Sequence, residues 1–121
     1  MVEGKRAGFK GYPKEITNLP EAEIPFEGVR AWILQGENHQ LVFFQMEKDA
    51  KVPEHSHEYR QWGMVIEGDM DLIIDGKPLN CKKGDDYLVP AGAKHWARFF
   101  TKTRVMDLFQ EKSRYHAKKS N

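Results

Sequence analysis

Two histidines and a glutamine lie close together near the middle of the chain. One serine separates His55 from His57, and Gln61 follows four residues after His57. Side chains alternate between the two faces of a β-strand, so residues two apart lie on the same face. Imidazole is the commonest metal ligand at neutral pH. The pair therefore predicts most of a metal site, although two solvated histidines in a charged loop would have the same spacing.

Gln61 is neutral, where an acidic residue would help to hold a divalent ion. It is either a ligand through its amide oxygen or a partner of a metal-bound water. In both cases the ion keeps its full double charge, which makes bound water more acidic and polarises a bound carbonyl more strongly. Iron sites that activate oxygen typically use two histidines and a carboxylate. The neutral side chain therefore favours Lewis-acid chemistry over a dioxygenase.

A metal that only polarises its substrate needs an acid or base to move protons, and Asp107 is the candidate. Val105, Asp107 and Phe109 share one face of a predicted strand by alternation. If that face is interior, Asp107 is a carboxylate among apolar side chains beside the metal, and such a group is a site candidate. Burial would raise its pKa and the cation would lower it, so its protonation state stays open. The alternative is that Asp107 faces solvent. Arg60 is a neighbour of the histidines and either meets an anionic substrate or forms a salt bridge at the rim.

Short strands separated by turn residues predict an all-β barrel or sandwich. Residues 1–28 are rich in glycine and proline, which predicts an extended N-terminal arm. Residues 29–111 form the barrel domain, and the basic residues 112–121 are expected to be a frayed tail. The expected strands cover residues 29–35, 40–47, 62–67, 70–74, 87–89, 94–100 and 104–109.

The composition narrows the possible functions. The 121 residues fit one domain, and the single cysteine, Cys81, excludes an intramolecular disulfide. The 19 basic and 18 acidic side chains give a net charge of +1, without the basic excess typical of nucleic-acid binding. The sequence has no apolar run of about 20 residues for a membrane span and no apolar core of a signal peptide at its start. A cytoplasmic protein is the expectation.

Two segments resemble the two motifs of the cupin superfamily. In residues 51–68, the histidine pair is followed by Gln61 and then, seven residues on, by Gly68, as in the first motif. In residues 84–95, the order Gly, five residues, Pro, one residue, Gly, two residues, His resembles the second motif and ends on His95. Phe99 stands where an asparagine often follows. The resemblance covers about residues 29–110.

The resemblance implies a small double-stranded β-helix, or jelly-roll, barrel. It also implies one divalent transition metal (Zn, Ni, Fe, Mn or Co) bound by His55, His57, Gln61 and His95. Taken alone, His95 would be interpreted as a core histidine with satisfied hydrogen bonds; beside the pair it becomes a ligand. Small cupins usually pair, so a homodimer is expected, with the arm crossing to the partner barrel.

The Asp107-x-Phe109 pair is similar to one that lines the site in the uronate-processing cupins of pectin degradation, which also carry three histidines and a glutamine. The resemblance implies a metal-dependent, isomerase- or lyase-like enzyme for a small oxygenated substrate, such as a sugar acid or keto compound. Asp107 would be catalytic, with Phe109 and Arg60 in the pocket. The alternatives are a non-haem iron dioxygenase and a non-catalytic sensor or small-ligand module.

Overall fold

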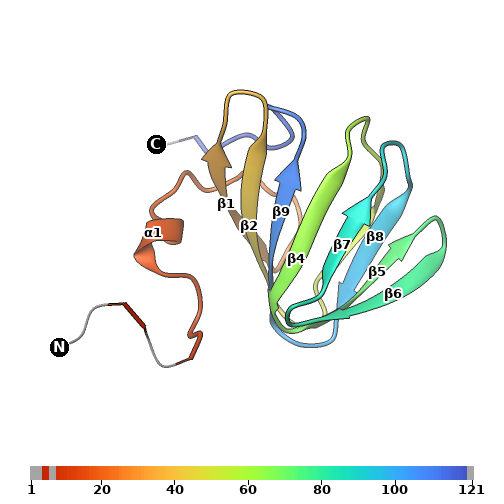
Figure 1. Ribbon diagram of the computed structural model, residues 1–121, viewed down its shortest axis with the longest axis horizontal. Coiled ribbons are helices and arrows are strands. Elements are labelled where there is room, and N and C mark those ends of the chain that lie inside the picture. The colour runs from red at the N-terminus through yellow and green to blue at the C-terminus, as the bar shows by residue number, and fades with distance from the viewer. Residues whose placement is uncertain (1–3, 6–7, 120–121) are drawn as a thin grey trace.

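The chain folds into two antiparallel β-sheets that face each other (Figure 1). The computed structural model describes residues 4–5 and 8–119. One sheet has the strand order β1-β2-β9-β4-β7 and the other has the order β3-β8-β5-β6. The expected all-β jelly-roll fold is confirmed. The strands are β1 (Val29–Gln35), β2 (Gln40–Met46), β3 (Lys51–His55), β4 (Gln61–Glu67), β5 (Asp69–Ile74), β6 (Lys77–Lys82), β7 (Asp86–Val89), β8 (His95–Phe99) and β9 (Thr103–Phe109).

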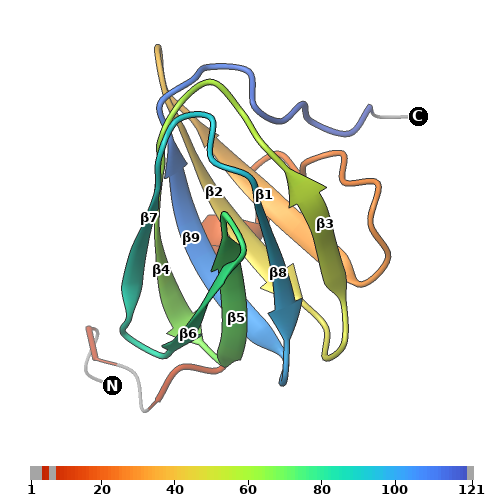
Figure 2. The ribbon, with the colours of Figure 1, turned by 90° about the vertical axis from the view of Figure 1, so that its right-hand side faces the viewer.

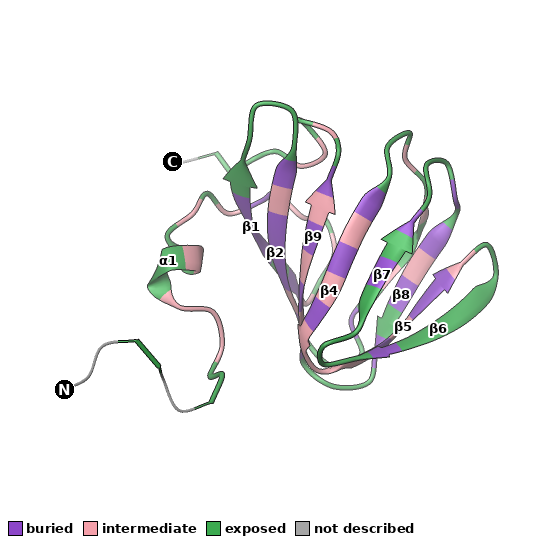
Figure 3. Ribbon diagram, viewed as in Figure 1, coloured by how far each residue is buried: buried purple, intermediate pink, exposed green. Residues whose placement is uncertain are grey.

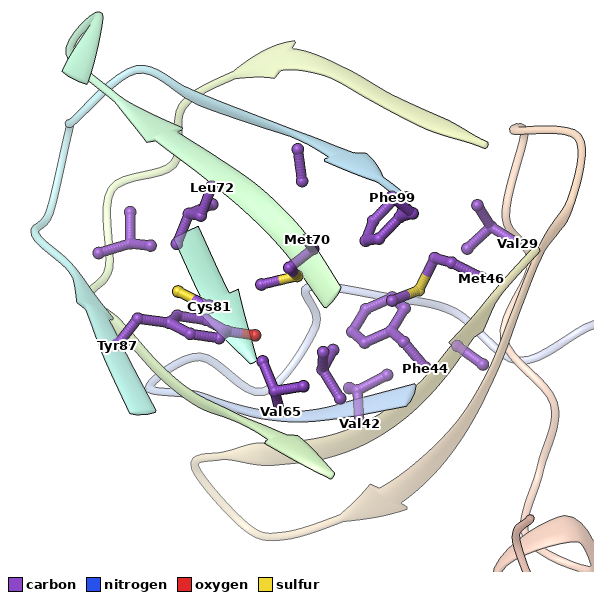
Figure 4. Packing of buried hydrophobic residues seen from close by; sticks show 14 of the residues in the cluster. Val29, Val42, Phe44, Met46, Val65, Met70, Leu72, Cys81, Tyr87 and Phe99 are labelled. Atoms are coloured by element: carbon purple, nitrogen blue, oxygen red, sulfur yellow. The ribbon is translucent and has the colours of Figure 1, made fainter. Parts of the chain in front are cut away.

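The interior between the sheets is filled by every second side chain of the strands. In β9, buried and half-buried residues alternate along the whole strand, and Figure 3 shows the same banding on its neighbours. This is the pattern of a sheet with one face toward the core. Figure 4 shows how these side chains meet inside the barrel. The core includes Val29, Val42, Phe44, Met46, Val65, Met70, Leu72, Tyr87, Val89 and Phe99.

Two strands, β3 and β6, were missed by the sequence analysis. Both are edge strands, because β3 pairs only with β8 and β6 pairs only with β5. Each contains a proline, Pro53 or Pro78, and most of their residues are exposed. Proline is tolerated on an edge strand, where one side of the backbone needs no partner. Such strands lack the apolar alternation by which the others were predicted.

The N-terminal arm lies against its own barrel. The Tyr12 hydroxyl donates hydrogen bonds of 2.9 Å to the carbonyl oxygens of Phe44 and Val105. Farther along, Ala22 bonds to the backbone of Ala31 on β1. Between these contacts the arm forms one helical turn, α1 (Lys14–Thr17). Among the described residues, no helix has the length and hydrophobicity needed to cross a membrane.

The C-terminal tail is docked up to Lys118, whose backbone N–H bonds to the Glu21 carbonyl, so the expectation of a frayed end is wrong for this part of the chain. Ala117 forms an antiparallel bridge with Ala22 in the arm. The Tyr115 ring packs edge-on against Phe44 and Phe109, each at 5.5 Å between ring centroids. Figure 2 shows the tail running across the end of the barrel at which β3 ends and β8 begins. Burial of an aromatic ring and backbone pairing hold it there.

Candidate metal centre

The three histidines meet at one end of the barrel. His55 is the last residue of β3 and His95 the first of β8, and the two are directly paired across the sheet. His57 lies in the loop after β3. One possible ligand atom from each histidine lies within 4.8 Å of those of the other two. The convergence predicted from the two motifs is therefore confirmed.

All three imidazole rings are oriented by the backbone. In each, Nδ1 lies 2.7 to 2.9 Å from a carbonyl oxygen two residues away. A carbonyl only accepts hydrogen bonds, so each Nδ1 carries the proton and each Nε2 keeps a free lone pair. This arrangement is typical of histidines that bind a metal through Nε2. The three acceptors are the carbonyl oxygens of Pro53, Tyr59 and Ala93.

The donor set fits a divalent transition metal. His95 is 3 % exposed, and its Nε2 has no hydrogen-bond partner among the described residues. Leaving a buried polar atom unpaired costs about 1–3 kcal/mol. Burial lowers the pKa of His95 to about 4 and also lowers the pKa of His55, so both rings are neutral at pH 7. Neutral imidazoles with free lone pairs are the ligands that such ions prefer.

Gln61, the first residue of β4, presents its oxygen to this cluster. The side chain is buried, and its Oε1 lies 3.0 Å from Nε2 of His57. Gln61 also hydrogen-bonds to Asp107, and only its amide nitrogen can donate to a carboxylate. The carboxylate therefore turns the amide oxygen toward His57. Two acceptor atoms this close favour a shared cation between them.

Asp107 faces the interior, as the alternation in its strand allowed. The residue is 5 % exposed, and Oδ1 accepts a hydrogen bond of 2.7 Å from the Tyr87 hydroxyl. Burial raises the pKa of Asp107 to about 6, while the hydrogen bonds from Tyr87 and Gln61 act in the opposite direction. The group can thus hold or release a proton near neutral pH. Its catalytic role stays a prediction.

Tyr87 was missed as a site residue. It lies on β7, and Figure 4 shows its ring reaching from the strand into the barrel. Burial, and to a lesser extent the charge of Asp107, raises the pKa of Tyr87 well above its usual value. The hydroxyl therefore stays protonated and donates its hydrogen bond to the Asp107 carboxylate. The sequence already predicted a strand at residues 87–89. Because Tyr87 and Val89 are two residues apart, strand alternation could have placed Tyr87 on the same inner face as Val89.

A cavity of about 70 Å³ lies among these groups, and its wall is mostly apolar. Phe109 belongs to the wall, and its ring centroid is 5.9 Å from that of His57. Arg60 is exposed and is not among the lining residues. Of the two residues proposed for the pocket, the structure brings only Phe109 to it. The polar side chains of the wall include His55, Gln61, His95, Tyr87, Asp107 and Tyr115.

The tail adds a cation that the sequence analysis did not consider. The Arg114 guanidinium lies 4.7 Å from the centroid of the Tyr115 ring and 6.0 Å from that of Phe109. Its Nε is buried and without a partner among the described residues. Burial is the main reason why the pKa values of His55 and His95 are lowered, and the charge of Arg114 adds a smaller effect in the same direction. The aromatic residue at 115 was the one indication that this tail would pack.

Comparison with known proteins agrees with this architecture. The Cupin domain family model matches residues 42–109, and the chain belongs to the cupin family. No curated protein matches it in sequence.

Several solved structures share the fold. An RmlC-like cupin from Shewanella frigidimarina NCIMB 400 is 26 % identical, with a TM-score of 0.71 over 80 % of this chain and 87 % of that one. KdgF from Halomonas sp. is 22 % identical, with a TM-score of 0.69 over 74 % and 86 %. A deletion mutant of Bacillus subtilis oxalate decarboxylase OxdC is 18 % identical, with a TM-score of 0.70 over 81 % of this chain and 29 % of that one.

Proposed function

We propose that this cupin is a metal-dependent enzyme that moves protons on a small oxygenated substrate, in an isomerase- or lyase-like reaction. A bound divalent ion would supply Lewis-acid polarisation of a substrate oxygen. The observation that carries the proposal is the position of Asp107, a buried carboxyl that lines the same cavity as His55 and His95. Its pKa of about 6 suits a group that takes up and returns a proton at neutral pH.

The residues have distinct roles in this proposal. His55, His57 and His95 would hold the ion through Nε2, and Gln61 would add its amide oxygen. Tyr87 holds the Asp107 carboxyl in place through the 2.7 Å hydrogen bond. The carboxyl in turn holds the Gln61 amide, so the acid/base group and the neutral ligand are positioned by one another.

Cavity size and charge support a small anionic substrate, such as a sugar acid. A cavity of about 70 Å³ admits only a small molecule or the reacting end of a larger one. Typical ligand pockets are larger, roughly 300 Å³ or more. Arg114 does not line the cavity, but it brings a positive charge to the same end of the barrel. A guanidinium that has no acidic partner among the described residues favours a carboxylate ligand.

Metal analysis tests the binding site. Chain purified without chelator is expected to carry about one equivalent of a divalent transition metal by elemental analysis. The double variant His55→Ala/His95→Ala should lose it, because two of the converging lone pairs are gone. The double variant His39→Ala/His116→Ala is the matched control, because both of these histidines are exposed and outside the cluster. Equal metal content in the two variants would exclude the proposed site.

The acid/base role of Asp107 is tested with candidate sugar acids and keto acids as substrates. NMR follows both the turnover and the exchange of solvent deuterium into the product. Asp107→Asn keeps an acceptor for Tyr87 but cannot take up a proton near neutral pH. We expect a loss of about 10²- to 10⁴-fold in kcat with unchanged metal content. Full turnover in this variant would show that Asp107 is not the acid or base.

Substrate charge is tested by comparing two arginines. Arg114→Gln is expected to raise KM for an acidic substrate about tenfold or more, because it removes a charge that acts on His55 and His95. Arg60→Gln removes an exposed arginine nearby and should leave KM unchanged. The reverse result would support Arg60 as the substrate-binding residue.

A further inference from the structure

The cavity beside the histidines has an open side between the two sheets. β1 ends one sheet and β3 ends the other, and within the described chain these two strands are not paired with each other. Residues 23–27 of the arm, which we call the strap, lie over this opening (Figure 2). Ile24 and Phe26 of the strap line the cavity together with Val29 of β1 and Val52 of β3. The strap therefore closes the side that the sheets leave open.

The strap has the side-chain pattern of a strand without the backbone pairing of one. Its second and fourth residues, Ile24 and Phe26, are half-buried, and the other three are exposed. Residues 24–27 form no backbone hydrogen bond with any part of the chain that the structure describes. Pro25 has no N–H to donate. Side-chain packing alone holds the middle of the strap, so lifting it breaks no backbone hydrogen bond.

Both ends of the strap are fixed to the rest of the chain. At its start, the Glu23 N–H donates a hydrogen bond of 2.7 Å to the carbonyl oxygen of His116. Just after it, the Gly28 carbonyl accepts a hydrogen bond of 2.8 Å from the N–H of Glu47. Gly28 has a φ of 78°, a left-handed conformation that favours glycine. A segment that is tied at both ends and free between them can lift and return to the same place.

A larger groove lies on the outer side of the strap. It has a volume of about 770 Å³ and is lined by residues 25–28, residues 47–51 and Pro53. This is within the range of typical ligand sites, roughly 300–1,000 Å³. In the described chain, Phe26 is the one residue that lines both this groove and the cavity of about 70 Å³. Its side chain therefore separates a groove of ligand size from the histidines inside the barrel.

Two tyrosines also line both the cavity and a surface groove, but hydrogen bonds hold them in place. The Tyr87 hydroxyl donates to Asp107 at 2.7 Å. Tyr115 is held through its backbone by the buried side chain of Gln40. Its N–H donates to Oε1 of Gln40 at 3.0 Å, and its carbonyl accepts from Nε2 at 2.9 Å. Phe26 has neither a polar side chain nor a paired backbone, so it is the easiest of the three to move.

We propose that Phe26 is the gate of the metal cavity. It lifts with the strap to admit a substrate from the groove and then closes over the reacting end. The proposal rests on the proposed function for its substrate, a sugar acid. Charged, exposed side chains in the groove suit the hydroxyl groups of such a molecule: Glu27, Glu47, Lys48, Asp49 and Lys51. A substrate longer than the cavity keeps its polar remainder in the groove, so Phe26 selects substrates by length.

Labelling of His95 by diethyl pyrocarbonate tests the gate without substrate or turnover. The reagent acylates a neutral imidazole nitrogen, and Nε2 of His95 is buried and unpaired among the described residues. The full chain is labelled with chelator present, and mass spectrometry compares His95 with the exposed His39 as an internal reference. Phe26→Ala is expected to raise the relative labelling rate of His95 at least about tenfold, because the partition is gone.

Two further variants separate movement of the strap from loss of stability. Pro25→Gly leaves the cavity wall in place but loosens the strap, and should raise the rate about threefold. This variant also decides the question if Phe26→Ala does not fold. Val65→Ala is the matched control, because Val65 is 1 % exposed, does not line the cavity and should leave the rate unchanged.

Three results would overturn the gate. The first is an unchanged labelling rate of His95 in Phe26→Ala, and the second is an equal increase in Val65→Ala. The third is an unchanged rate in Pro25→Gly, which would show that the strap does not lift. Circular dichroism establishes that each variant is folded.

Turnover distinguishes the failure of the gate from the failure of the proposed function. Phe26→Ala should raise kcat/KM for a two-residue sugar acid, relative to a single-residue one, about tenfold. If no acid is converted while the labelling of His95 responds as expected, the proposed reaction is wrong and the gate stands. If the wild type converts an acid but neither the labelling nor this ratio changes in Phe26→Ala, the gate is wrong and the reaction stands.

Discussion

Gly63 makes room for the hydrogen bond that holds the acid/base candidate in place. It lies on β4 directly between Tyr87 on β7 and Asp107 on β9. A Cβ added at Gly63 would overlap Oδ1 of Asp107 and the ring carbons of Tyr87. Because these two side chains fill the space where a methyl group would stand, Gly63→Ala must displace one or both of them.

The cost of Gly63→Ala can be worked out from these contacts. Overpacking a core by one methyl group costs about 1–3 kcal/mol. Breaking the buried hydrogen bond between Tyr87 and Asp107 costs about 1–3 kcal/mol more. The lower entropy of the unfolded alanine chain returns about 0.4–1 kcal/mol. We expect a net loss of about 3 kcal/mol, or a fall in Tm of about 10 °C for a domain of this size.

Urea denaturation and thermal unfolding, followed by circular dichroism, measure this loss. Both are done with chelator present, because a bound metal would add to the stability of the folded state. Gly76→Ala is the control: Gly76 has a positive φ of 80°, but a Cβ there would meet nothing within 4 Å. It should cost about 1 kcal/mol, from the left-handed backbone conformation alone. Equal losses in the two variants would refute the packing argument at Gly63.

Three further predictions concern stability. Tyr87→Phe removes a hydroxyl donor from the buried Asp107 and should lower the free energy of unfolding by about 1–3 kcal/mol in urea titrations; no change would mean that the carboxyl finds another donor. Tyr115→Ala removes an aromatic ring that packs against the barrel end and should cost about 3 kcal/mol by the same measurement, whereas a frayed tail would cost nothing. Glu21 is paired with Arg30, whose hydrogen bond lowers the pKa of Glu21 from 4.5 to about 2. The stabilisation is present above pH 4.5 and lost as the pH falls toward 2, so wild type and Glu21→Gln should differ by at most about 1 kcal/mol near neutral pH and converge at pH 2; a constant difference would contradict the assignment.

The sequence alone determined the histidine cluster. The spacing of His55 and His57 and the turn before His95 matched the two motifs, so their convergence could be predicted, although His57 lies in the loop after β3 and not on the strand that alternation assumed. The same alternation put Asp107 and Phe109 on one face of a strand. It could not decide which face is interior, because that depends on the neighbouring strands and not on the spacing within one strand.

Only the tertiary structure decided the rest of the site. Tyr87 reaches Asp107 because two distant strands flank Gly63, and no local pattern reports a contact of this sequence separation. The basic tail has the composition of a frayed end, yet the burial of Tyr115 fixes it over the barrel and brings Arg114 against the rings of Phe109 and Tyr115. The sequence fixes which side chains a strand can present together, whereas packing between segments far apart in the chain determines which groups meet, which are buried and how their pKa values shift.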